Sequence, residues 1–180
     1  MKKRLAYYLA CSNGIIFSAA NVALSLNKYS ENKNYDIVIS SRLLTESNET
    51  ALRKIPHVRL MSLKFPKGLE TFLLSDEGLP SGRWKAPNAL NTISHFEIFR
   101  LLDEYKTVIW IDSDIAIQGD VSDLANYGPL GLPTDQHNGH QFLVRDQFTK
   151  PVPGYKMNIP AYQNSCIVVT DELPYKEMYA

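Results

Sequence analysis

Residues 107–117 carry the strongest structural signal in the chain and read Thr107-Val-Ile-Trp-Ile-Asp-Ser-Asp-Ile-Ala-Ile117. An uncharged run rich in β-branched residues is typical of a buried strand. Two aspartates follow it directly, at the carboxyl end of the strand, where open α/β sheets bind their ligands. Because side chains alternate along extended backbone, we expect Asp112 and Asp114 to point to the same side.

Segments on either side of this strand alternate between strand and helix patterns. The alternation predicts an α/β fold with a mostly parallel central sheet and helices on both of its faces. In the first expected helix, Phe17, Ala20 and Leu24 are apolar residues at helical spacing. Strands are expected at 5–10, 35–40, 58–61, 107–111 and 166–170, helices at 17–26, 45–54 and 90–105, and loops rich in proline and glycine at 62–88 and 127–160.

The composition fits a single domain over residues 1–180, because 44% of the residues are hydrophobic and can bury a core. The formal net charge is zero, so no basic field is available to attract nucleic acid. Cys11 and Cys166 lie far apart and form no metal or disulfide motif, which favours a reducing compartment. No segment approaches the roughly 20 apolar residues of a membrane span. We therefore predict a cytoplasmic protein that could also contact the inner face of the membrane.

The aspartate pair has two interpretations. Asp112 could cap a turn while Asp114 is a solvated loop residue. Alternatively, two carboxylates in one small site repel each other unless a cation lies between them, and Mn²⁺ or Mg²⁺ suits such oxygen ligands. The position after a buried strand favours the metal site. Haloacid-dehalogenase-like phosphatases also place a D-x-D after a strand, but the position of the pair at 112 and the following Ile-Ala disfavour that class.

Three motifs in order resemble glycosyltransferase family 8, a family of retaining enzymes of the GT-A fold that use UDP-sugars. The first is the opening strand, which ends in Ala10-Cys-Ser-Asn13. The second runs from the helix at 95–105 through the D-x-D to Asp120-Val-Ser-Asp-Leu124. The third is Tyr162-Gln-Asn-Ser-Cys-Ile-Val-Val169. The resemblance covers nearly the whole chain, although the later histidine motif of the family is not found, so the C-terminal part of the family domain is missing.

The resemblance implies roles for individual residues. The D-x-D aspartates would bind Mn²⁺, and the remaining positions would contact the nucleotide sugar. His95 occupies the place of an arginine that lies near the donor, with Arg100 as the alternative if it faces the cleft. No catalytic nucleophile is assigned. The implied metal ligands are Asp112 and Asp114, and the implied nucleotide-sugar contacts are Ala10, Cys11, Asn13, His95, Asp112, Ser113, Asp114, Asp135, Asn164 and Ser165.

The expected function is a metal-dependent hexosyltransferase. It would move glucose or galactose from UDP-glucose or UDP-galactose to a glycan or a lipid-linked saccharide of the lipopolysaccharide type. Two alternatives stay open. One is a nucleotide-sugar-binding module without turnover, suggested by the missing C-terminal motif. The other is a nucleotidyltransferase, which the lack of a glycine-rich phosphate loop beyond Gly14 disfavours.

Overall fold

The computed structural model describes residues 3–41, 44–63, 94–131 and 166–178, and these ranges form one α/β unit. The strands are β1 (Lys3–Cys11), β2 (Tyr35–Ser41), β3 (Val58–Ser62), β4 (Tyr105–Ile111), β5 (Leu130–Gly131) and β6 (Cys166–Thr170). The α-helices are α1 (Ile16–Tyr29), α2 (Glu46–Arg53) and α5 (Glu97–Leu101). Short 3₁₀ helices are η1 (Asn13–Ile15), η2 (Ser94–Phe96), η3 (Ser122–Asn126) and η4 (Tyr175–Met178).

The six described strands form one mixed sheet in the order β3-β2-β1-β4-β6-β5. Strands β1 to β4 are parallel, whereas β6 runs antiparallel to both β4 and β5. The two central strands, β1 and β4, are in register, with Tyr8 opposite Trp110. The predicted mostly parallel sheet is therefore confirmed.

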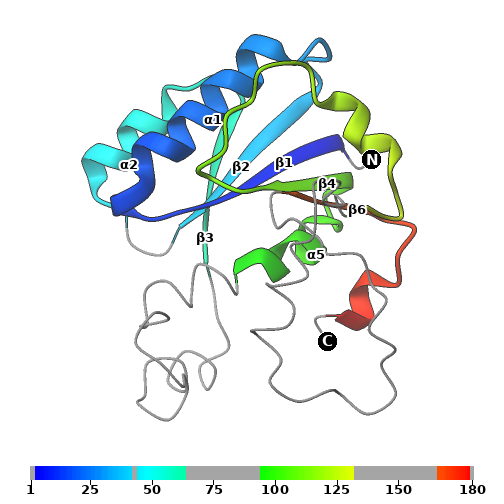
Figure 1. Cartoon of the computed structure of the whole chain (residues 1–180). Coiled ribbons are helices and arrows are strands. Elements are labelled where there is room, and N and C mark those ends of the chain that lie inside the picture. The colour runs from blue at the N-terminus through cyan, green and yellow to red at the C-terminus, as the bar shows by residue number, and fades with distance from the viewer. Residues whose placement is uncertain (1–2, 42–43, 64–93, 132–165, 179–180) are drawn as a thin grey trace, which may run out of the picture.

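The sheet has helices on both faces, as the sequence predicted. Figure 1 shows α1 and α2 on one face and α5 on the other. Alternate residues of β1 divide between the two layers: Tyr7 and Leu9 pack with α1, whereas Ala6 and Tyr8 pack with α5. Both central strands are buried along most of their length, which explains why the 107–111 segment carries no charge.

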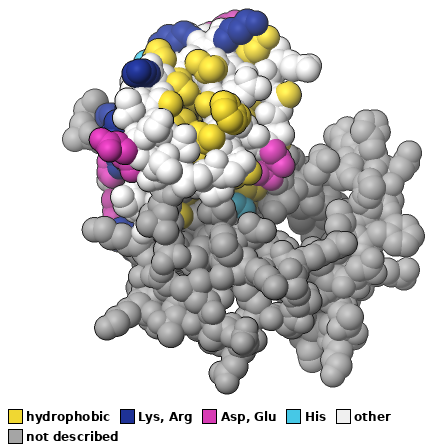
Figure 2. Space-filling model, turned by 90° about the vertical axis from the view of Figure 1, so that its left-hand side faces the viewer, with side chains coloured by type: hydrophobic (Ala, Val, Ile, Leu, Met, Phe, Trp, Pro, Cys, Tyr) yellow, Lys and Arg dark blue, Asp and Glu magenta, His cyan; other side chains and the backbone are white. Residues whose placement is uncertain are grey.

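The apolar residues of α1 divide between its two sides. Of the three at helical spacing in the sequence, Phe17 is 88% exposed and Leu24 is 50% exposed, whereas Ala20 packs partly against the core. The buried side of the helix consists of Ile16, Ala19, Val22, Ala23 and Leu26. Figure 2 views the side of the molecule where α1 begins and shows hydrophobic side chains gathered on that surface.

The helix predicted at 90–105 is also wrong in its extent. Among the described residues, the helical segment begins with η2 at Ser94 and α5 ends at Leu101, and residues 90–93 lie outside the description. Tyr105 belongs to β4. Its hydroxyl donates to Asp36 Oδ2 of β2 at 2.5 Å. Apolar residues continue from α5 into β4, so the apolar pattern of the sequence did not show where the helix ends and the strand begins.

Ionic side chains connect the amino-terminal ends of the parallel strands; we call this group the amino-edge network. Lys3 Nζ of β1 pairs with Asp36 Oδ2 of β2 at 2.5 Å. Arg59 of β3 forms a two-pronged pair with Glu104, just before β4. Its guanidinium also donates to the Tyr105 hydroxyl at 3.3 Å. Four neighbouring strands are thus joined by side chains at one edge.

The amino-edge network predicts acid sensitivity. Burial alone raises the pKa of Asp36, but hydrogen bonds from Lys3 and Tyr105 and nearby positive charge lower it overall. A carboxyl pKa that is lower in the folded state stabilises the protein above the unfolded-state pKa, and this contribution is lost as the pH falls through the folded value. We expect Asp36→Asn to destabilise the protein at neutral pH and much less at about pH 3.

Urea unfolding at both pH values measures this difference. Asp123→Asn is the matched control, because Asp123 is an exposed carboxylate in η3. A loss of stability in Asp36→Asn that does not change with pH would show that the network acts through shape and not through charge.

The packing of the short β5 strand depends on a glycine. A Cβ added to Gly131 would lie 2.6 Å from the backbone oxygen of Tyr127 and 3.3 Å from Cβ of Val168. A Cβ at Gly119 meets nothing within 4 Å. We expect Gly131→Ala to lower the unfolding free energy by about 1–3 kcal/mol, and Gly119→Ala to change it by less than about 0.5 kcal/mol. Thermal and urea unfolding of the two variants would measure this, and equal effects would contradict it.

Candidate functional site

The carboxyl ends of the central strands meet at one edge of the sheet, opposite the amino-edge network. From β1 the chain passes through α1 to β2 on one side, whereas β4 lies on the other side of β1. Such a reversal of strand order is a topological switch point, where ligands bind in α/β sheets. Cys11 ends β1 and Ile111 ends β4. The segments at 10–13 and 112–114 therefore lie at the same edge, although about a hundred residues of sequence separate them.

Asp112 and Asp114 follow β4 at this edge. Asp112 is half-buried, and its Oδ1 accepts a hydrogen bond from the Ser113 backbone N–H at 2.8 Å. Burial and, second, the negative charge of Asp114 raise the pKa of Asp112, although the Ser113 bond lowers it in part. The two carboxylates are therefore close enough to repel, as expected for an aspartate pair in one site.

This pair fits a hard divalent cation. Mg²⁺ and Mn²⁺ prefer carboxylate oxygens, usually through one or two side chains, with substrate phosphates and water completing the shell. Within the described ranges, no group of three or more histidine, cysteine or acidic side chains gathers around a common point. The two aspartates would thus be the protein ligands that this part of the chain supplies.

His95 lies in η2 and packs on the buried Trp110, with ring centroids 4.1 Å apart and planes tilted by 47°. Burial lowers the pKa of His95 to about 4, so the imidazole is neutral at physiological pH. A neutral imidazole can donate one hydrogen bond and accept another, but it supplies no positive charge. Trp110 precedes Asp112 by two residues, which places His95 against the end of the strand that leads to the aspartate pair.

Arg100, the alternative to His95, is engaged elsewhere. Its guanidinium pairs with Glu97 one turn earlier on α5, at 3.0 Å. In the described residues, Arg100 therefore contacts Glu97, whereas His95 contacts Trp110. Of the two candidates, His95 is the one packed on the strand that delivers the aspartates.

Asn13 joins the site edge to α2. Its Oδ1 accepts hydrogen bonds from the Thr45 backbone N–H at 3.1 Å and from Asn48 Nδ2 at 2.9 Å. Thr45 is the N-cap of α2, and its hydroxyl accepts from the Asn48 backbone N–H. The side-chain oxygen Oδ1 of Asn13 therefore helps to fix the position of the first turn of α2.

Ala10 and Cys11 are buried at the end of β1, with 7% and 0% of their surface exposed. Burial raises the pKa of the Cys11 thiol to about 11, which makes it a small apolar residue and not a nucleophile. Cys166 begins β6 opposite Ile111, and both cysteines are free.

One positioning contact was missed by the sequence analysis. The Tyr8 hydroxyl bridges Ser40 Oγ and the Ser94 carbonyl oxygen, both at 2.6 Å. This bridge ties β1 and β2 to the start of η2, directly before His95. The available signal was a tyrosine inside an apolar strand, because a buried hydroxyl needs a polar partner.

Three predicted contact residues lie outside the described residues: Asp135, Asn164 and Ser165. The described positions among the predicted set are brought to one edge of the sheet by β1, η1, η2 and β4. Their assigned roles in binding a nucleotide sugar stay predictions.

Comparison with known proteins gives a fold and not a family. No family model matches the sequence, and no curated protein matches it. Similar solved structures include the galactosyltransferase LgtC in complex with donor and acceptor sugar analogues, at TM-score 0.69 and 13% identity over 96% of this chain and 62% of that one. The bifunctional glycosyltransferase WbbM matches at TM-score 0.63 and 17% identity, over 99% of this chain and 32% of that one.

A third solved structure, the glycosyltransferase GlyE of Streptococcus pneumoniae TIGR4, matches at TM-score 0.54 and 16% identity over 99% of this chain and 36% of that one. The chain thus spans less than two thirds of the length of each of these structures. At these identities the similarity establishes architecture. The chain has a GT-A-like glycosyltransferase fold, and the predicted fold class is confirmed.

Proposed function

We propose that the chain is a metal-dependent hexosyltransferase of the family 8 type. It would transfer glucose or galactose from a UDP-sugar to a glycan or lipid-linked saccharide acceptor. The observation that supports this most directly is the position of Asp112 and Asp114 at the switch point of a GT-A-like sheet, where burial of Asp112 and the nearby charge of Asp114 raise the pKa of Asp112.

The residues at this edge would bind different parts of the donor. A bound Mn²⁺ or Mg²⁺ would stabilise the negative charge of the departing diphosphate as a Lewis acid. Asp112 and Asp114 would hold the ion, with Ser113 fixing the orientation of Asp112 through its backbone N–H. His95, neutral and supported by Trp110, would offer a hydrogen bond to the sugar without competing with the metal for the phosphates.

Calorimetry with UDP, with and without Mn²⁺, tests the binding step. Release of UDP from UDP-glucose or UDP-galactose tests turnover. We expect Mn²⁺-dependent binding and release of UDP in the presence of a saccharide acceptor. If UDP does not bind with Mn²⁺ present, the proposal is wrong.

A second candidate is a nucleotide-sugar-binding module. It is favoured by one observation: the described residues offer the ion two carboxylates and no third side chain from histidine, cysteine or an acid. Metal-dependent UDP binding without release of UDP from any donor and acceptor pair would select this candidate.

The cellular location follows from the donor in this proposal, because cytoplasmic UDP-sugars would be the substrate. None of the helices in the described part of the chain has the length and apolar character of a membrane span. Contact with the inner face of the membrane would come through the acceptor.

A further inference from the structure

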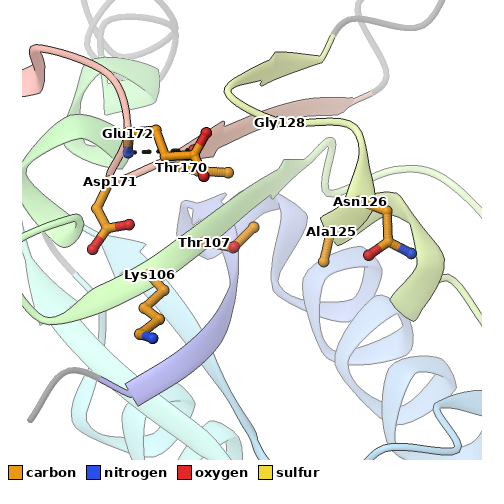
Figure 3. A pocket seen from close by; sticks show the side chains of 8 residues that line it. All are labelled: Lys106, Thr107, Ala125, Asn126, Gly128, Thr170, Asp171 and Glu172. Carbon is orange, nitrogen blue, oxygen red and sulfur yellow. Dashed lines mark hydrogen bonds between the residues drawn. The ribbon is translucent and has the colours of Figure 1, made fainter.

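A pocket of about 390 Å³ opens at the edge of the sheet opposite the aspartate pair. Figure 3 shows how it forms where the start of β4, the end of β6 and the turn after η3 come together. Its volume lies within the range of roughly 300–1,000 Å³ that is usual for small-molecule sites. The residues that line it are Lys106, Thr107, Ala125, Asn126, Gly128, Thr170, Asp171 and Glu172.

Backbone hydrogen bonds fix the walls of this pocket. The Thr170 N–H donates to the Pro129 carbonyl at 3.0 Å, and the Asp171 N–H donates to the Lys106 carbonyl at 2.9 Å. Gly128 lies so close to Thr170 that an added Cβ would be 2.4 Å from Thr170 Cγ2. The three segments therefore hold their spacing without a ligand, which lowers the entropic cost of binding one.

The lining offers hydrogen-bonding groups of both kinds. Thr107 and Thr170 are opposite each other in the β4–β6 register, so their side chains share one face of the sheet. Each hydroxyl can donate and accept, and the Asn126 amide can do both as well. Thr170 Oγ1 also accepts from the Glu172 N–H at 3.4 Å, which leaves its proton available (Figure 3).

The charges around the pocket disfavour an anion. Asp171 and Glu172 bring two carboxylates against the single cation of Lys106. A phosphate or nucleotide would be repelled there, whereas an uncharged polyol would meet donors and acceptors without a net charge penalty. Tyr127 is 65% exposed and lies in the same turn, between Asn126 and Gly128, which both line the pocket.

We propose that this pocket is a second site for a neutral sugar, separated from the aspartate edge by the length of β4. Hydroxyl groups of the sugar would bond with Thr107, Asn126 and Thr170. The ring of Tyr127 would cover the apolar face of the sugar. The site needs no metal and no nucleotide, so it stands or falls independently of the proposed transfer reaction.

The test is an NMR titration of the labelled chain with glucose, galactose or lactose, in the absence of metal and UDP. We expect shifts concentrated at residues 106–107, 125–128 and 170–172. The double variant Asn126→Ala with Tyr127→Ala should weaken binding by roughly tenfold, because it removes an amide and a ring. Asn21→Ala is the control, since Asn21 is an exposed asparagine on α1.

Both substituted side chains of the double variant are exposed, so its amide spectrum should otherwise match that of the parent chain. The proposal is overturned if no neutral sugar shifts these residues, if the double variant binds as well as the control, or if inorganic phosphate shifts them equally. Sugar-dependent shifts confined to residues near Asp112 would likewise overturn the second site while leaving the proposed transferase untouched.

Discussion

Asp112→Asn or Asp114→Asn is expected to weaken Mn²⁺-dependent UDP binding by at least about 100-fold while the domain stays folded. The loss would follow from removing one of the two proposed carboxylate ligands. Because burial and the charge of Asp114 raise the pKa of Asp112, a neutral side chain at 112 removes an unfavourable charge. Asparagine Oδ1 can still accept the Ser113 N–H. Without metal, Asp112→Asn should be as stable as the parent chain or slightly more stable.

Two measurements check this expectation. Calorimetry compares UDP binding with and without Mn²⁺, and urea unfolding compares stability without metal. Asp123→Asn controls for the loss of one negative charge nearby, because Asp123 is exposed in η3 and should have no effect. Asp112→Ala tests the turn-cap interpretation, because alanine cannot accept the Ser113 N–H. If Asp112→Ala lost more than about 1 kcal/mol of stability without metal while Asp112→Asn did not, Asp112 would be a structural turn cap.

Trp110→Ala is expected to lower the free energy of unfolding by about 3–5 kcal/mol. Trp110 is 1% exposed and belongs to the core between the sheet and α5. The substitution also removes the ring on which His95 packs. Loss of stability should therefore be accompanied by a rise in the pKa of His95 from about 4 toward its ordinary value near 6.5.

Urea unfolding measures the first effect and an NMR titration of His95 measures the second, with Trp110→Phe as the milder variant if the alanine form does not fold. Phe17→Ala is the matched control, since Phe17 is an aromatic residue that is 88% exposed. It should change stability by less than about 0.5 kcal/mol. Equal losses from the two aromatic substitutions would contradict the assignment of Trp110 to the core.

The sheet could be predicted because each of its central strands carries a local signal. Residues 107–111 are apolar because β4 is buried on both faces, and the alternation of elements selected a parallel arrangement. The antiparallel direction of β6 could not be predicted, since pairing depends on how the chain between 131 and 166 returns. The buried side of α1 could not be predicted, because Phe17 is apolar yet exposed and apolar spacing alone does not separate the two sides of this helix.

The candidate site residues that are close in sequence could be predicted. The contacts between residues that are far apart in sequence could not. Asp112 and Asp114 follow a recognisable strand, so their edge of the sheet was predicted. The contact of His95 with Trp110 joins residues fifteen positions apart across a helix, and the Tyr8 bridge joins residues 32 and 86 positions apart. Such contacts arise from tertiary packing and leave no local pattern.

The amino-edge network has a consequence for how this architecture can diversify. Lys3, Asp36, Arg59 and Tyr105 fasten neighbouring strands at the end remote from the aspartates. These side chains stabilise the strand alignment at the amino-terminal ends of the parallel strands. Insertions or exchanges in the loops at the carboxyl ends therefore need not disturb that alignment. Such a molecule could acquire new ligand preferences by loop replacement alone, with its sheet unchanged.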